Sequence, residues 1–127
     1  MELLKIESTK QTPEIDFNNK TGVLLIRGRS MSENSFEFFK EVNLWIEEYL
    51  NSPVEETIVK IHLEYFNTSS SKCILEIFKK LKKINDIQDK NINIKWFYDE
   101  DDEEMMETGE DYQDITDLPF EILIANE

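Results

Sequence analysis

The residues best suited to chemistry form a polar run, Asn67-Thr68-Ser69-Ser70-Ser71, between an apolar segment and a helical pattern. Hydroxyl side chains at the start of a helix accept hydrogen bonds from the free N–H groups of its first turn. A phosphate suits the same position, because it meets those N–H donors and the positive end of the helix dipole. The run therefore indicates either a helix cap alone or a phosphorylation switch, with Lys72 as a neighbouring positive charge.

Catalytic and metal-binding groups are scarce in the rest of the chain. The only histidine, His62, lies in an apolar strand pattern, and the only cysteine, Cys73, precedes an apolar helical stripe, so we expect both to be structural. The three glycines are isolated, which excludes a P-loop and a dinucleotide-binding glycine motif. The acidic run that starts at Asp99 has Glu104 where a calcium-binding EF-hand loop requires glycine. We therefore predict no catalytic residue, no metal and no cofactor.

Charge is distributed very unevenly along the 127 residues, whose formal net charge is −14. All 14 basic residues lie at or before Lys95, whereas residues 99–127 hold 13 of the 28 acidic residues. Such a chain is a poor nucleic-acid binder, since phosphate backbones attract Lys and Arg. The acidic segment 99–117 is either a solubilising surface or a docking surface for a basic partner.

Several features of the sequence bear on the cellular compartment of the protein. No apolar run approaches the ~20 residues of a membrane span, so we predict no membrane partner. The first ten residues are charged throughout, which argues against a signal peptide. A single cysteine forms no internal disulfide, which is typical of the reducing cytoplasm.

The hydrophobic pattern predicts how these residues are positioned. It favours five strands and three helices in the order β-β-α-β-α-β-α-β, within a single domain over residues 1–127. The strands are expected at 12–17, 23–27, 56–66, 91–98 and 120–125, and the helices at about 35–51, 72–84 and 103–112. We expect the first two strands to form a hairpin and the third helix to be interrupted at Gly109. Alternating strands and helices predict an α/β fold with a mixed sheet and helices packed against it.

The first predicted helix has its own signals. Ser32 or Asn34 is a plausible N-cap, because both side chains accept hydrogen bonds from the first turn. Apolar residues then recur at spacings of three and four and predict the buried stripe. This stripe comprises Phe36, Phe39, Val42, Ile46 and Tyr49, with Trp45 beside it. The other aromatic residues of this helix, such as Phe38, either belong to the core or supply an exposed apolar anchor for a partner.

Five segments together resemble the SiaC family of regulatory phosphoproteins, whose fold is similar to that of STAS-type anti-sigma-factor antagonists. They are STKQTPEIDFN (8–18), SMSENSFEFF (30–39), YFNTSSSK (65–72), IKWFYDEDDEEM (94–105) and DLPFEI (117–122), in family order over nearly the whole chain. The resemblance implies a STAS-like domain without enzymatic activity. It also implies a threonine that a dedicated kinase phosphorylates and a PP2C-type phosphatase dephosphorylates. The unphosphorylated form would bind a GGDEF diguanylate cyclase and stimulate cyclic-di-GMP synthesis, which promotes biofilm formation.

The resemblance places the family threonine at Thr68, with Ser69 and Ser70 as the alternative sites. The family's ENS element matches Glu33-Asn34-Ser35, and we expect this element to lie near Thr68 because both segments precede helices on one side of the sheet. Asn67 stands where the antagonists have Asp, so their partner class does not transfer directly.

Three other functions are consistent with the sequence. One is an anti-sigma-factor antagonist that binds an anti-sigma kinase. Another is a small metal-dependent enzyme with an acidic cleft. The third is an acidic mimic of nucleic acid, against which the confinement of the acidic residues to the last quarter argues.

Overall fold

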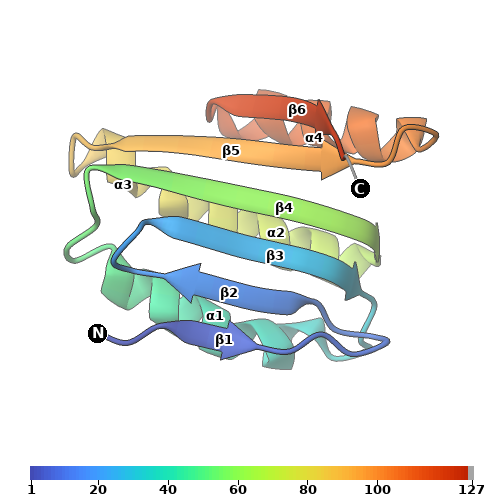
Figure 1. Ribbon diagram of the computed structural model, residues 1–127, viewed down its shortest axis with the longest axis horizontal. Helices are drawn as coiled ribbons and strands as arrows, with labels where there is room; N and C mark the ends of the chain where they lie inside the picture. Colours follow the sequence, from blue (N-terminus) through green and yellow to red (C-terminus); the bar gives the residue numbers. More distant parts are fainter. Residues whose placement is uncertain (126–127) are drawn as a thin grey trace.

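The computed structural model describes residues 1–125 and contains one six-stranded sheet in the order β1-β2-β3-β4-β5-β6 (Figure 1). The strands are β1 (Leu4–Ile6), β2 (Glu14–Asn18), β3 (Val23–Ser30), β4 (Glu56–Phe66), β5 (Asn91–Tyr98) and β6 (Phe120–Ile124). β1, β2 and β3 pair antiparallel, and β3 to β6 pair parallel. The predicted mixed α/β fold is therefore confirmed.

The three long helices lie behind the sheet in Figure 1, so one face of the sheet is covered and the other is open. The helices are α1 (Ser35–Tyr49), α2 (Thr68–Leu81), the one-turn α3 (Lys83–Asp86) and α4 (Glu103–Thr116). Figure 1 shows α1 behind the β1–β3 half, α2 behind the middle, and α4 behind the β6 edge. No helix among the described residues is long and apolar enough to cross a bilayer.

The core lies between the helices and the covered face. Along β4, buried residues alternate with more exposed ones, as expected where successive side chains point to opposite faces. Thr57, Val59, Ile61 and Leu63 are buried toward the helices, so the residues between them face the open side. Burial of these and similar side chains on β2, β3 and β5 stabilises the sheet by about 1.5–3 kcal/mol for each large aliphatic residue.

Two predicted features of the elements need correction. The sheet has six strands rather than about five, because β1 also pairs with β2. This strand is only three residues long at the edge of the sheet, too short for a period-two pattern to be recognised. The polar run at 68–71 is the first turn of α2 rather than a loop before it.

Two predictions about individual helix residues are also wrong. Phe36 was expected in the buried stripe of α1, but it is 62% exposed. The buried face begins at Ser35, which is 1% exposed, and position 36 lies about 100° around the helix from it. Gly109 does not interrupt α4, which runs on to Thr116. A Cβ at position 109 would lie 2.5 Å from Cδ1 of Trp96, so glycine is needed for the close approach of α4 to β5.

Candidate functional site

The candidate site lies where the N-terminal ends of α1 and α2 meet. α1 follows β3 and α2 follows β4. These two strands are parallel neighbours, so both helices begin beside the C-terminal ends of the strands. Asn34 caps α1 by accepting a hydrogen bond from the Glu37 N–H (3.3 Å), which selects Asn34 over Ser32 as the N-cap. Asn67 caps α2 by accepting from the Ser70 N–H (2.9 Å).

Four serine hydroxyls join the two helix starts, and we refer to Ser30, Ser35, Ser69 and Ser70 as the hydroxyl cluster. Ser30 Oγ donates to Ser70 Oγ (2.7 Å), and Ser35 Oγ and Ser70 Oγ lie 2.9 Å apart. Ser69 Oγ donates to Ser35 Oγ (2.9 Å). Ser30, Ser35 and Ser70 are at most 2% exposed, so these hydrogen bonds satisfy hydroxyls that water does not reach.

Thr68 differs from the three serines that follow it. Its side chain is exposed and makes no hydrogen bond within residues 1–125, whereas Ser70 is fully buried. Ser69 is half-buried and its hydroxyl donates toward Ser35 and Asn67. Ser71 is half-buried and its Oγ lies 2.9 Å from the hydroxyl oxygen of Tyr112. Of the four residues in this turn, only Thr68 is exposed and makes no side-chain hydrogen bond within residues 1–125.

Asn67 also connects the two segments. Its Nδ2 donates to the Ser32 carbonyl oxygen (3.1 Å), while its Oδ1 accepts from the first turn of α2. An Asp at this position would keep the acceptor but lose the donor. The side-chain amide therefore fixes the chain before α1 against the start of α2.

The remaining residues selected from the sequence differ in their placement. Ser35 is part of the hydroxyl cluster, which confirms that the ENS element lies beside the start of α2. Asn34 acts as the α1 cap, and Glu33 is exposed without a hydrogen bond to the cluster among the described residues. Lys72 is exposed one turn beyond Thr68 on the same side of α2, since residues four apart are neighbours on a helix.

Exposed apolar side chains occur on the segments that form this edge. Met31 follows Ser30, Phe36 follows Ser35, and Tyr65 lies near the end of β4. Their exposed fractions are 38%, 62% and 53%. We refer to Thr68 together with Met31, Phe36 and Tyr65 as the switch surface. Phe38, for which the sequence left open a core position or an exposed anchor, is half-buried and packs against Phe39 with ring centroids 5.0 Å apart.

Contacts of α4 also reach the first turn of α2. The Tyr112 hydroxyl donates to the Ser71 carbonyl oxygen (3.0 Å). Burial raises the pKa of Tyr112, and the hydrogen bond from Ser71 opposes part of that rise. Burial, with a smaller contribution from Glu76, also raises the pKa of Cys73, which is 3% exposed and so lacks the features of a reactive thiolate.

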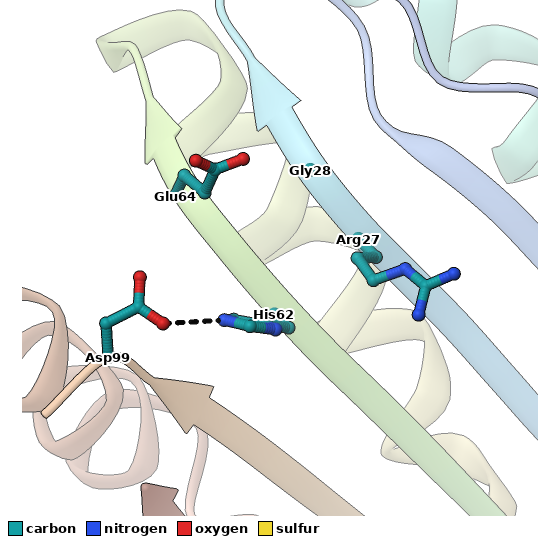
Figure 2. Close-up of a pocket in the computed structure, with 5 residues that line it drawn as sticks. All are labelled: Arg27, Gly28, His62, Glu64 and Asp99. Atoms are coloured by element: carbon teal, nitrogen blue, oxygen red, sulfur yellow. Dashed lines mark hydrogen bonds and ion pairs between the residues drawn. The ribbon is translucent and has the colours of Figure 1, made fainter. Parts of the chain in front are cut away.

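His62 lies away from this edge, on the open face of the sheet. Its Nε2 is 3.2 Å from Asp99 Oδ1, at a hollow of about 290 Å³ that also involves Arg27, Gly28 and Glu64 (Figure 2). No serine, threonine or cysteine side chain lines this hollow, so the pair lacks the hydroxyl or thiol that a Ser–His or Cys–His nucleophile pair requires. Within residues 1–125, no three His, Cys, Asp or Glu side chains are placed to hold a metal ion together.

The sequence did not reveal the role of Ser30. It ends β3, 40 residues before Ser70, and only the parallel pairing of β3 with β4 brings the two together. A serine at a strand end is common, and the fully polar run at 67–71 gave no indication of its buried partner.

Comparisons with known proteins show the family and the fold. The model of the SiaC family of regulatory phosphoproteins matches residues 6–125. An uncharacterised protein of Pseudomonas aeruginosa strain UCBPP-PA14 is 31% identical over 124 residues, which are 98% of each chain. The crystal structure of apo-SiaC from Pseudomonas aeruginosa has a TM-score of 0.89 at 30% identity, over 97% of this chain and 99% of that one.

A second solved structure is similar to the same extent. It is the crystal structure of the diguanylate cyclase SiaD in complex with its activator SiaC, also from Pseudomonas aeruginosa. The matched chain gives a TM-score of 0.88 at 30% identity, over 96% of this chain and 99% of that one.

Proposed function

The chain belongs to the SiaC family of regulatory phosphoproteins, and we propose that it is a non-enzymatic switch that activates a GGDEF diguanylate cyclase. The unphosphorylated form binds the cyclase and stimulates cyclic-di-GMP synthesis. A dedicated kinase phosphorylates Thr68 and prevents binding, and a PP2C-type phosphatase restores it. The similarity to an activator bound to its cyclase supports the partner class. The observation that carries the site is the exposure of Thr68 beside a buried hydroxyl cluster.

Accessibility favours Thr68 over its two alternatives. A kinase must reach the hydroxyl oxygen and place it in line with the phosphate of its nucleotide. Ser70 is 0% exposed and bonded to Ser30 and Ser35, so its phosphorylation would require the first turn of α2 to open. Ser69 is half-buried with its hydroxyl donated to Ser35. Only Thr68 can receive a phosphate without loss of a hydrogen bond among the described residues.

The position of Thr68 also determines how a phosphate acts. Thr68 is the first residue of α2, so the added charge of about −1.5 to −2 lies beside free N–H groups and the positive end of the dipole. Lys72 is one turn away on the same side of the helix. These interactions stabilise the start of α2 rather than unfold it. The switch therefore works through charge and bulk on an intact surface.

The switch surface provides the apolar contact for the partner. Single exposed apolar residues are ordinary, but Met31, Phe36 and Tyr65 all belong to segments that converge at the start of α2. Large aromatic side chains of this kind carry much of the binding energy at interfaces. A phosphate beside them would have to be desolvated on docking, which opposes binding.

Phosphate mapping tests the site directly. The chain is co-expressed with the proposed dedicated kinase, and intact mass and fragmentation locate the modification in the wild type and in Thr68→Ala and Ser69→Ala. We expect one phosphate, at Thr68, which is lost in Thr68→Ala and retained in Ser69→Ala. Phosphate at Ser69 or Ser70 in the wild-type chain would refute the assignment.

Thermal unfolding tests how the phosphate acts. The phosphorylated chain should be no less stable than the unmodified one, because dipole and Lys72 interactions contribute a few tenths to ~1 kcal/mol each. Lys72→Gln, which keeps the length of the side chain, should remove part of that gain in the phosphorylated form only. A phosphorylated chain that melts several degrees lower would show that the switch acts by unfolding α2.

Two variants of one helix test the docking surface. Phe36→Ala should weaken cyclase binding at least about fivefold, which corresponds to a loss of about 1 kcal/mol or more. Leu44→Ala is the matched control, because Leu44 is 59% exposed on α1 but lies eight residues further along the helix. Stability of both variants should be nearly unchanged, since both side chains are exposed. Equal loss of binding in the two variants would contradict the assignment of the switch surface.

A further inference from the structure

The open face of the sheet has a row of neighbouring side chains at its centre. The strand register places Leu25 of β3 beside Lys60 of β4, and Lys60 beside Lys95 of β5. Neighbouring strands lie about 4.8 Å apart, so the stems of the two lysines start side by side. Both lysines alternate with buried residues of their strands and therefore point away from the helices.

Two like charges directly opposite each other destabilise a sheet. Lys60 and Lys95 are half-buried, and neither forms an ion pair within residues 1–125. Glu121 is the other neighbour of Lys95 in the row, but it also forms no ion pair there. Within residues 1–125, the two lysines thus lie side by side without an ion-pair partner, with Glu121 as the acidic neighbour at one end of the row. An unpaired cation pair in a strongly acidic chain indicates an anion that arrives from outside.

A hollow of about 280 Å³ adjoins the pair. It is lined by Leu25, Arg27, Lys60, His62, Phe97 and Ala125, and the acidic Glu64 and Asp99 lie in the adjoining hollow. It shares Arg27 and His62 with the hollow of Figure 2, so the two form adjoining parts of one depression on the open face.

The ring of Phe97 is half-buried at this hollow, next to His62 in the register, with the two ring centroids 6.3 Å apart. Its neighbour on β6 is the half-buried Leu123, so an apolar platform borders the cation pair. The ligand therefore needs both a polyanionic part and a flat apolar part. A nucleotide combines the two, because its base stacks on an aromatic ring while its phosphates accept hydrogen bonds from ammonium groups.

We propose that the open face binds a nucleotide, with its phosphates on Lys60 and Lys95 and its base against Phe97. This site is separate from the switch surface, which lies at the starts of α1 and α2. The inference does not depend on the phosphorylation of Thr68 or on the cyclase. The hollow is close to the lower size limit of about 300 Å³ for small-molecule sites, which suits a single nucleotide rather than a larger ligand.

Titration of the full chain followed by backbone amide NMR tests the proposal. ATP and GTP are the probes, and inorganic pyrophosphate supplies phosphates without a base. We expect saturable shifts at Lys60, Lys95 and Phe97 with either nucleotide, weakening as salt is raised. Pyrophosphate should bind at least about fivefold more weakly, because it lacks the stacking interaction.

Two double variants of equal charge provide the comparison. Lys60→Gln with Lys95→Gln should weaken nucleotide binding about tenfold or more, since each lysine donates a charge-assisted hydrogen bond. This variant should fold, because it removes a repulsion, and thermal unfolding checks that. Lys79→Gln with Lys83→Gln changes two exposed lysines on the helix side by the same charge and should leave binding within about twofold.

Three results would each overturn the proposal. The first is the absence of saturable shifts with ATP and GTP, and the second is equal weakening in the two double variants. The third is a glutamate-rich peptide that saturates the same amides more tightly than either nucleotide, which would identify the open face as a protein-docking surface instead.

Discussion

The hydrogen bond between the buried hydroxyls of Ser30 and Ser70 is expected to contribute measurably to stability. Ser70→Ala removes the only acceptor that the Ser30 hydroxyl has among the described residues, and Ser30 is 2% exposed. A buried donor left without a partner costs about 1–3 kcal/mol. Ser30→Ala should cost less, about 0.5–1.5 kcal/mol, because Ser70 keeps its contact with Ser35 at 2.9 Å.

The double variant distinguishes a true pair from two independent sites. Ser30→Ala with Ser70→Ala leaves no orphaned donor at position 30, so it should be less destabilised than the sum of the single variants by about 1 kcal/mol. Urea unfolding followed by tryptophan fluorescence measures all three variants and the wild type. For a chain of this length each kcal/mol corresponds to roughly 3–6 °C in melting temperature. If the stability losses of the two single variants sum to that of the double variant within about 0.3–0.5 kcal/mol, the coupling is refuted.

Three further predictions concern the caps and helix contacts. Asn67→Ala should destabilise the chain by about 1–2 kcal/mol in urea unfolding. Asn67→Asp should recover part of this loss because it keeps the cap acceptor. Equal losses of stability in the two variants would show that the cap contributes nothing. Gly109→Ala should destabilise by roughly 1–2 kcal/mol despite the better helix propensity of Ala, because the new Cβ would lie 2.5 Å from Trp96, whose fluorescence should change; a stabilised variant would contradict this packing. Burial raises the pKa of Tyr112, so its neutral form is favoured in the folded state. The contribution of the neutral Tyr112 phenol to the free energy of unfolding is complete below the pKa of the unfolded state, about 10. It is lost as the pH rises through the pKa that Tyr112 has in the folded state. Tyr112→Phe should therefore show a smaller loss of stability above pH 10 than the wild type, and identical pH profiles would count against the burial.

Much of the fold could be predicted because local patterns agreed with tertiary packing. The run ETIVKIHLEYF predicted β4 with its observed bounds, and the stripe through Ile74, Ile77 and Phe78 indicated the buried face of α2. Gly109 was misinterpreted because a glycine inside a helix usually weakens it. Here the missing side chain allows α4 to approach Trp96, a contact that no local pattern records.

Only part of the site could be predicted from the sequence. The polar run and the family resemblance pointed to Thr68, but the reason for choosing Thr68 over Ser70 is burial, which depends on hydrogen bonds to Ser30 and Ser35 far away in the chain. The proximity of Lys60 and Lys95 likewise depends on the register of two parallel strands. Period-two patterns give the face on which a side chain lies, but not its neighbour across the sheet.

The most direct test of the switch measures cyclase activity. The rate of cyclic-di-GMP synthesis by the proposed GGDEF diguanylate cyclase partner is followed while either the unmodified or the Thr68-phosphorylated protein is added. We predict saturable stimulation by the unmodified protein and by Thr68→Ala, and little or none by the phosphorylated protein at the same concentrations. Equal stimulation by the phosphorylated and unmodified forms would contradict the account, because Thr68 would then not control the partner.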